Sequence, residues 1–295
     1  MRKCVLPLCL LIFFALIITG CYYSRHKIVI GMVPYNNPAD VIKDFNPIKE
    51  YIENETGIDI EVVVTGDYLG LIEFMKAKKV DIGWYGPFSY VAGDSVVKLE
   101  PLVVQYRKGS GIGYFSQIIV RSDSGIRNIN DLRGKRFAFV ETGSTSGFVI
   151  PSALFKSRDI DIQQYFTTIK YSGTHDSVAI DVINKNVDAG AMDDIVLNSM
   201  VDTGKLKRED VKVIWKSDVI PGSPYVARSD LDKTLKDKFK AAMLSIHEKA
   251  PQALKTHDQR VEKFVECDSS TYNSIRNTAK ILGEEFIKEK FLKKK

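Results

Sequence analysis

Cysteine is scarce in this chain, and the shortage excludes several classes of protein. The 295 residues contain four cysteines. Cys4, Cys9 and Cys21 fall in the N-terminal segment, so Cys267 is the only one in the rest of the chain. A single thiol provides neither a disulfide framework nor a metal site of clustered cysteines. Because the residues beside Cys267 are acidic and would not lower its pKa, we interpret it as structural rather than nucleophilic.

The chain also lacks a strong excess of charge of either sign. Its formal net charge is +5, and it falls to about +3 when residues 1–20 are removed, because they carry two positive and no negative charges. Such a small surplus gives no argument for a nucleic-acid partner, and we interpret Lys293–Lys295 as a solvated tail. The hydrophobic content of 44% is typical of a globular protein with a substantial core.

Motifs for metal and phosphoryl-transfer chemistry are missing too. No H-E-x-x-H motif and no zinc-type Cys/His spacing occurs, so we expect neither a metal nor a cofactor. The loop Gly143–Gly147 is not followed by the lysine of a Walker loop. Its middle residue is Thr145, so the G-x-S-x-G elbow of hydrolases is absent as well. His26, His247 and His257 lie in charged stretches that we expect to be exposed.

Only the N-terminus contains a long hydrophobic run. Arg2 and Lys3 precede Val5–Ile18, which is nearly all apolar, and small residues then lead to Cys21. This order resembles a bacterial lipoprotein signal, which predicts a signal peptide at residues 1–20 and lipid on Cys21. The run is short for a spanning helix, and an uncleaved anchor is the alternative. Both interpretations place the remaining chain outside the cytoplasm.

Short apolar runs alternate with amphipathic stretches along the rest of the chain. Ile28–Val33, Ile58–Thr65 and Val80–Trp84 read as strands. Val41–Thr56 and Leu69–Ala77, which lie between them, read as helices. The same pattern restarts in the second half of the chain. This alternation predicts an α/β fold with largely parallel sheets.

The two α/β halves have no Pro/Gly/Ser-rich linker between them, which predicts two lobes joined by crossing strands. We place the crossings near Gln117–Val120 and Tyr225–Ala227. The expected lobes are residues 21–118 with 225–295, and residues 119–224, and we expect the C-terminal helices to pack on the first lobe. Ligands of open α/β sheets lie beyond the carboxyl ends of the strands, so we expect the site in the cleft between the lobes.

The loop Gly143–Gly147 is the most informative local feature. Three hydroxyl residues, Ser144, Thr145 and Ser146, stand between its glycines, after a strand-like run and before an apolar segment. Glycine lets the backbone approach a ligand, and a helix N-terminus adds free N–H groups and partial positive charge. His175 lies in a second Gly/Thr turn and would complete the shell around a small oxyanion. For the loop alone, an ordinary helix cap is the alternative.

Further polar residues stand at other predicted strand ends. They are Tyr35, Tyr68, Tyr85 and Asp193, and we expect them to converge with the hydroxyl loop on one side of the molecule. Tyr68 follows a turn and offers an O–H donor on a rigid ring, whereas the core is the alternative place for Tyr85. Asp193 can accept a hydrogen bond from a protonated ligand or an amino group, or fix the donor tautomer of His175.

The same residues leave a catalytic interpretation open. Ser144 or Ser146 with His175 and Asp193 has the composition of a hydrolytic triad, although a triad is defined by geometry. Because the elbow motif is absent, we expect binding and no enzyme activity. A secreted hydrolase or transferase on the same fold is the alternative.

Six short segments occur in the order found in one family. They are Asp67–Glu73, Gly86–Val91, Asp131–Lys135, Ser144–Gly147, Ser172–Ser177 and Ile220–Pro224. Together they resemble the phosphate, phosphite and phosphonate substrate-binding proteins of ABC transporters, the phosphonate-binding protein family. The resemblance runs from about Ile28 to Asp230. It implies a two-lobed, hinged periplasmic-binding-protein fold of type II, with two crossover strands and the ligand in the cleft.

The resemblance also implies a set of ligand-binding residues. They are Tyr68, Tyr85, Ser144, Thr145, Ser146, His175 and Asp193. The hydroxyls and His175 match the two most specific segments, and Tyr68 is the tyrosine of the D-Y-x-G-x-I-E motif. Tyr85 matches the position before Gly-Pro. We favour Asp193 over Asp194 as the acidic residue, because it comes directly after the apolar run.

The resemblance implies partners and a location as well. The ligand would be a phosphonate, phosphite or phosphate, delivered to an ABC permease in the cytoplasmic membrane. Lipid on Cys21 would hold a monomer at the outer face of that membrane, and delivery to a membrane sensor is the alternative to transport. Ligand groups on both lobes imply hinge closure. The donor role of His175 predicts that the ligand affinity changes with pH at about pH 6–7.

Overall fold

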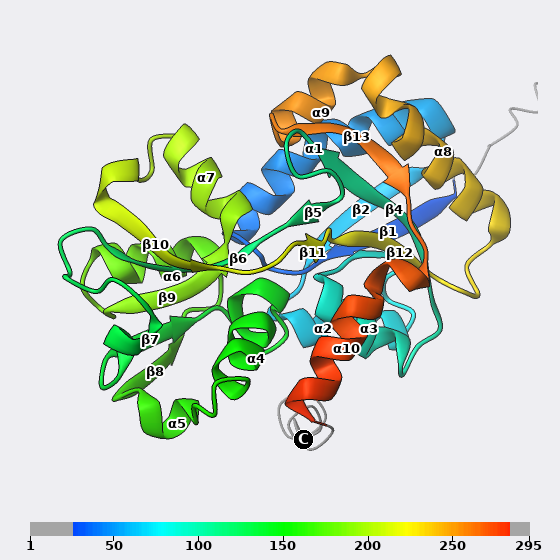
Figure 1. Ribbon diagram of the computed structural model, residues 1–295. Coiled ribbons are helices and arrows are strands. Elements are labelled where there is room, and N and C mark those ends of the chain that lie inside the picture. Colours follow the sequence, from blue (N-terminus) through cyan, green and yellow to red (C-terminus); the bar gives the residue numbers. More distant parts are fainter. Residues whose placement is uncertain (1–25, 284–295) are drawn as a thin grey trace, which may run out of the picture.

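The computed structural model describes residues 26–283, which form two α/β lobes, each built on its own sheet (Figure 1). The α/β class predicted from the alternating pattern is confirmed. The predicted signal peptide at residues 1–20 and the lipidated Cys21 lie outside the described residues. Within residues 26–283, no helix has the length and apolar character needed to cross a membrane.

The first sheet has six strands in the order β13-β4-β12-β3-β1-β2. These strands are β1 (Lys27–Met32), β2 (Asp59–Val64), β3 (Ile82–Trp84), β4 (Leu99–Arg107), β12 (Pro224–Arg228) and β13 (Val261–Glu266). β1 pairs in parallel with β2 and β3, and β12, β4 and β13 extend the sheet with antiparallel pairs. The helices of this lobe are α1 (Pro38–Thr56), α2 (Tyr68–Lys76), α3 (Pro87–Asp94), α8 (Lys233–Lys249) and α9 (Pro251–His257).

The second sheet has five strands in the order β10-β6-β9-β7-β8. These strands are β6 (Ser116–Arg121), β7 (Arg136–Phe139), β8 (Thr168–Tyr171), β9 (Ala189–Asp193) and β10 (Val211–Lys216). β7 is parallel to β8 and β9, and β6 is antiparallel to β9 and β10. The helical segments are η1 (Ile129–Leu132), η2 (Thr145–Val149), α4 (Ile150–Lys156), α5 (Ile162–Tyr165), α6 (His175–Ile183), α7 (Asp194–Asp202) and η3 (Arg208–Asp210).

A two-stranded antiparallel ribbon connects the lobes. Its strands are β5 (Gly113–Tyr114) and β11 (Ile220–Pro221). This ribbon does not coincide with the crossings that we expected near Gln117–Val120 and Tyr225–Ala227. Those residues are already paired within the two large sheets, in β6 and β12. The expected lobe boundary after residue 118 divides β6, and the strand pairing supports a boundary before Ser116 instead.

The chain packs tightly beside the ribbon. The backbone N–H of Gly222 donates to the carbonyl of Ile112 at 2.6 Å. The hydroxyl of Tyr272 donates to the carbonyl of Gly222 at 3.0 Å. A Cβ atom on Gly222 would lie 2.7 Å from the Ile112 carbonyl oxygen, closer than a real Cβ comes to such an atom. Glycine is therefore required here by packing.

We expected all the C-terminal helices to pack on the first lobe, but one of them contacts both lobes. α8 and α9 lie against α1 and β13 of that lobe (Figure 1). The 3-10 turn η4 (Ser269–Tyr272) leads into α10 (Asn273–Leu282), which contacts α3 of the first lobe and α4 of the second. Lys156 Nζ donates to the Leu282 carbonyl at 2.7 Å. α10 therefore contacts both lobes.

Candidate binding site between the lobes

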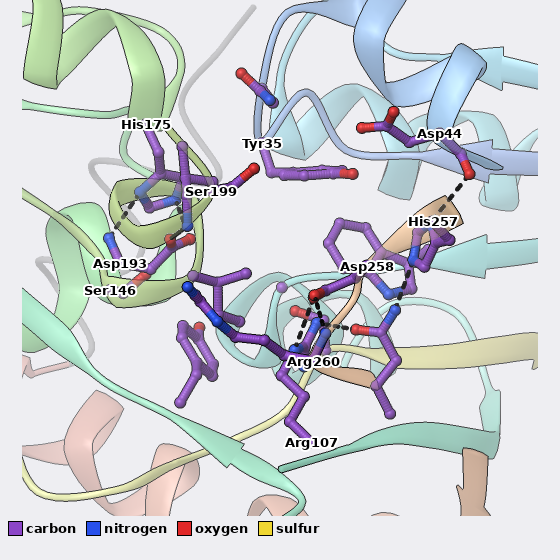
Figure 2. Close-up of a pocket in the computed structure, with 18 of the residues that line it drawn as sticks. Tyr35, Asp44, Arg107, Ser146, His175, Asp193, Ser199, His257, Asp258 and Arg260 are labelled. Atoms are coloured by element: carbon purple, nitrogen blue, oxygen red, sulfur yellow. Dashed lines mark hydrogen bonds and ion pairs between the residues drawn. The ribbon is translucent and has the colours of Figure 1, made fainter. Parts of the chain in front are cut away.

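A cavity of about 790 Å³ lies between the lobes, at the carboxyl ends of strands from both sheets. Six of the expected site residues line it: Tyr68, Ser144, Thr145, Ser146, His175 and Asp193. Figure 2 shows Ser146, His175 and Asp193 on one side of the cavity, which we call the inner end. Arg107 and His257 lie on the opposite side, which we call the outer end.

The hydroxyl loop begins a helical segment and faces the cavity. Ser144 is the N-cap of the π-helical turn η2, and its Oγ accepts the N–H of Gly147 at 3.1 Å. η2 continues directly into α4, with Pro151 near the start of that helix. Thr145 and Ser146 are about 1% exposed and line the cavity with Ser144. The loop is therefore both a helix cap and a set of hydroxyl donors.

Two hydrogen bonds donated by backbone N–H groups cross between the lobes at the inner end. The Oγ1 of Thr145 accepts the N–H of Phe88 at 2.8 Å, at the N-terminus of α3. The N–H of His175, at the N-terminus of α6, donates to the carbonyl of Tyr35 at 3.1 Å. The lobes are therefore in contact around the cavity. Because the Thr145 oxygen acts as an acceptor here, its own O–H is available as a donor.

Two phenols reach the hydroxyl loop. Tyr68 lies beside the side chain of Ser144, and Tyr114 lies beside those of Thr145 and Ser146. Burial raises the pKa of both phenols above the usual value, so both remain protonated donors. Tyr114 was missed in the sequence because it lies in a two-residue strand of the connecting ribbon, where no periodic pattern marks it.

Tyr85 lies apart from the cavity. It is fully buried, and its hydroxyl donates to the carbonyl of Leu71 at 3.2 Å in the core of the first lobe. Its neighbours Trp84 and Gly86 line the cavity instead. Successive residues of an extended chain point in opposite directions, so Tyr85 faces away from the cleft that Trp84 faces. We therefore leave Tyr85 out of the proposed ligand set.

His175 is buried and is held at both ring nitrogens. The backbone N–H of Asp193 donates to Nδ1 at 3.0 Å, so Nδ1 carries no proton in this arrangement. Nε2 lies 3.3 Å from Ser144 Oγ and 3.3 Å from Asp193 Oδ2. Burial lowers the pKa of His175, and the opposite effect of the Asp193 carboxylate is smaller. The neutral ring therefore presents an Nε2–H donor.

Asp193 contributes through both its backbone and its carboxylate. Its Oδ1 caps α7 by accepting the N–H of Val196 at 2.7 Å. From the sequence we expected that this carboxylate could fix the tautomer of His175. The backbone N–H of Asp193 fixes it instead. Asp194, the alternative acidic residue, accepts the N–H of Phe115 at 2.8 Å and is not part of the cavity lining.

The arrangement differs from that of a hydrolytic triad. In a triad the carboxylate holds one ring nitrogen of the histidine and the serine lies at the other. Here the Asp193 carboxylate and Ser144 Oγ both lie at Nε2 of His175. A ring with its proton on Nε2 cannot accept a serine proton there. In the part of the chain that the structure describes, no three His, Cys, Asp or Glu side chains are grouped to hold a metal ion.

Several helices begin at the inner end of the cavity. α2, α3, η2 with α4, α6 and α7 all have their first residues at or beside its lining. Their N-terminal N–H groups and partial positive charges favour an anion. The lining cations are Arg107 on β4, Lys255 on α9 and Arg260 just before β13, away from these helix starts. A small oxyanion at the inner end would therefore be held by neutral donors and helix N-termini.

The outer end of the cavity was not predicted from the sequence. Arg107 on β4 is 6% exposed, and its Nε lies 3.2 Å from a carboxylate oxygen of Asp258. His257, expected to be exposed, is half-buried, and burial lowers its pKa. Gln105 Nε2 lies 2.8 Å from His257 Nε2. These residues are distant in the chain and meet because β4 pairs with β13, so no local pattern marks them.

The chain resembles known proteins over most of its length. The family model of periplasmic substrate-binding proteins of phosphonate ABC transporters matches residues 30–272. The phosphate-import protein PhnD of Mycolicibacterium smegmatis is 34% identical over 278 residues, which are 88% of this chain and 86% of that protein. The phosphonates-binding periplasmic protein of Escherichia coli is 32% identical over 214 residues, which are 71% of this chain and 63% of that protein.

Solved structures share the two-lobed fold. A binding protein of an ABC phosphonate transporter from Pseudomonas aeruginosa has a TM-score of 0.81 and 25% identity, covering 87% of this chain and 86% of that one. PhnD1 from Prochlorococcus marinus, solved with methylphosphonate, has a TM-score of 0.79 and 20% identity, covering 88% and 98% of the two chains. By its family match and these relatives, the chain belongs to the periplasmic substrate-binding proteins of phosphonate ABC transporters.

Proposed function

We propose that this protein binds a small phosphorus oxyanion at the inner end of the cavity and delivers it to the membrane permease of an ABC transporter. The proposed ligand residues are Tyr68, Tyr114, Ser144, Thr145, Ser146, His175 and Asp193. The observation that carries the proposal is the convergence of neutral O–H and N–H donors with helix N-termini. The relatives named for phosphate import and for phosphonate binding support this class of ligand.

The donors suffice for useful affinity. A dissociation constant near micromolar corresponds to about 8 kcal/mol. Hydrogen bonds to a charged group contribute roughly 1.5–3 kcal/mol each, before the cost of association. About five to seven such bonds, from the phenols, the hydroxyl loop and His175, meet that requirement.

The Asp193 carboxylate favours a ligand that keeps one proton. It lies 3.3 Å from His175 Nε2, where the oxyanion would also accept its hydrogen bond. An ionised oxyanion and the carboxylate would repel if both faced that N–H, whereas a P–O–H group can donate to the carboxylate. We therefore infer that a monoprotonated phosphate or phosphonate is the preferred form.

We also infer that Cys21 carries a lipid that holds a monomer at the outer face of the cytoplasmic membrane. The N-terminal charge, apolar run and small residues before Cys21 support this inference. A mass shift of the N-terminal peptide that corresponds to a lipid would test it. An unmodified Cys21 in the membrane fraction would contradict it.

Binding without catalysis is the role that we infer for the site. The donor tautomer of His175 supports it, because the ring has no free basic nitrogen facing Ser144. A secreted hydrolase or transferase is the alternative, and turnover of phosphate esters by the purified protein would favour it. Delivery to a membrane sensor is a second alternative, which would be favoured if no permease and ATPase genes lie beside this one.

Isothermal titration tests the proposed ligand class. We expect the protein without its signal peptide to bind at least one of phosphate, phosphite, methylphosphonate and 2-aminoethylphosphonate. Trp84 lines the cavity, so its fluorescence offers a second measurement, with Trp84→Phe as the control. Binding to a sulfonate or an amino acid, and to none of the four phosphorus compounds, would overturn the proposal.

A further inference from the structure

The cavity is much larger than a bare oxyanion. A tetrahedral phosphorus oxyanion has about five non-hydrogen atoms and fills about 150 Å³, if each takes the roughly 30 Å³ of a water molecule. The cavity volume is about 790 Å³, although the lobes are already in contact. Ion pairs of Asp40 with Lys205 and of Asp202 with Arg260 also join the lobes. The extra volume is therefore not explained by separated lobes.

The outer end has a polar network of fixed direction. Arg107 Nη2 donates to Gln105 Oε1, so the Gln105 amide must use its nitrogen toward His257 Nε2. His257 then carries its proton on Nδ1, which donates to the carbonyl of Asp44 at 3.2 Å. The Arg107 Nε donates to Asp258 at 3.2 Å. Each planar side chain of this network is held in one orientation before any ligand arrives.

The network leaves both donors and acceptors for a ligand. A guanidinium has five N–H groups, and Gln105 and Asp258 account for two of those of Arg107. The Asp44 carboxylate and Tyr35 also line the cavity, and burial raises the pKa of both groups. The guanidinium of Arg107 is already paired with Asp258, so an anionic substituent would gain little there.

Two aromatic rings also line the cavity. Tyr35 and Trp84 line the cavity and contact each other edge to face, with ring centroids 4.7 Å apart. Such rings pack against the apolar C–H faces of a carbon chain or sugar ring. The indole N–H of Trp84 is buried and has no hydrogen-bond partner within residues 26–283.

We propose that the outer end is a second subsite, which binds the hydroxylated substituent of a polyol phosphate, a sugar phosphate or an equivalent phosphonate. Hydroxyl groups both donate and accept, which matches the N–H groups of Arg107 and the carboxylate of Asp44. Tyr35 and Trp84 supply the apolar contact. The inference rests on the proposed function, because it takes the inner end as the phosphorus site.

Titration calorimetry with matched esters tests this subsite. Methyl phosphate and glycerol 3-phosphate share the phosphate ester and differ in the substituent. We expect glycerol 3-phosphate or ribose 5-phosphate to bind at least about tenfold more tightly than methyl phosphate, or about 1.4 kcal/mol. The anionic substituent of phosphonoacetate should give no such gain over methylphosphonate, because Arg107 is already paired with Asp258. A polyol or sugar ester that binds no more tightly than methyl phosphate overturns the inference, as does a tenfold gain confined to a charged substituent.

Two variants place the effect at the outer end. Tyr35→Ala, which removes the ring, and Asp44→Asn, which removes the carboxylate, should each weaken glycerol 3-phosphate binding about tenfold more than methyl phosphate binding. Glu50→Gln, on the exposed face of α1, is the matched control and should alter neither. Equal losses for both esters would overturn the inference. If neither methyl phosphate nor methylphosphonate binds the unaltered protein, the proposed function fails; if they bind and the polyol esters gain nothing, only this inference fails.

Discussion

The backbone N–H of Asp193 donates to Nδ1 of His175 at 3.0 Å, and this bond decides how the histidine can act. An occupied Nδ1 leaves the proton of the neutral ring on Nε2, beside Ser144 Oγ. The ring is therefore oriented as a donor toward the cavity. Because β9 ends at Asp193, a strand of the second lobe also sets the tautomer of His175.

The first prediction concerns pH and the ligand affinity. Burial lowers the pKa of His175, so the ring stays neutral and donating from about pH 8 to below its ordinary pKa of about 6.5. We expect His175→Gln to weaken methylphosphonate binding by a constant factor over about pH 6–8, measured by calorimetry. This replaces the sequence-based expectation of a change around pH 6–7. A factor that varies with pH across the ordinary histidine pKa would contradict it.

The second prediction separates two hydroxyls of the loop. Ser146→Ala should weaken ligand binding by about 1–3 kcal/mol and leave the melting temperature of the free protein unchanged, because one donor is lost. Ser144→Ala should also lower the melting temperature, because the Ser144 hydroxyl caps the N–H of Gly147. Calorimetry and thermal melting measure the two effects. If Ser146→Ala lowers the melting temperature with affinity intact, Ser146 has only a structural role.

The third prediction concerns closure of the lobes. Thr145→Val removes the oxygen that accepts the N–H of Phe88 across the cleft, and should weaken binding by about 1–3 kcal/mol. Thr145→Ser keeps that oxygen and is the control. With saturating methylphosphonate, small-angle scattering should give a smaller radius of gyration for the control than for Thr145→Val. Equal radii for the two variants would argue against this contact as a closing interaction.

The fourth prediction concerns acid stability. Burial, nearly complete for His175 and partial for His257, lowers the pKa of both rings in the folded protein, whereas an unfolded histidine titrates at about 6.5. Below that pH the unfolded chain binds protons that the folded protein does not. Stability should therefore fall as the pH drops below about 6.5, by up to about 1.4 kcal/mol per pH unit for each ring. His257→Gln should flatten this decline in thermal melts, and an unchanged slope would speak against its contribution.

The fifth prediction concerns the connecting ribbon. Gly222→Ala should lower the free energy of unfolding by about 1–3 kcal/mol, because its Cβ would press on the Ile112 carbonyl. Gly66→Ala is the matched control, since a Cβ there meets nothing within 4 Å, and it should change stability by no more than about 1 kcal/mol. Urea denaturation of the free protein measures both. Similar values for the two variants would show that packing at Gly222 is unimportant.

The sequence by itself determined the fold class and the inner end of the cavity. Alternating strand and helix patterns predict the α/β lobes, and parallel strands bring their carboxyl-end loops to one side. The hydroxyl loop and His175 follow the ends of β7 and β8, and Asp193 is the last residue of β9. Their chemistry and place could therefore be predicted from local pattern, as could the family to which the chain belongs.

Tertiary structure alone decided the direction of each side chain and the outer end of the cavity. Tyr85 directly follows the end of β3, a position from which a side chain can face the cleft. Its hydroxyl instead points into the core and donates to the Leu71 carbonyl. Arg107 and His257 are far apart in the chain and become neighbours through the pairing of β4 with β13. The physical reason is that local pattern reports periodicity and burial, whereas a pocket depends on strand register and on contacts between segments distant in sequence.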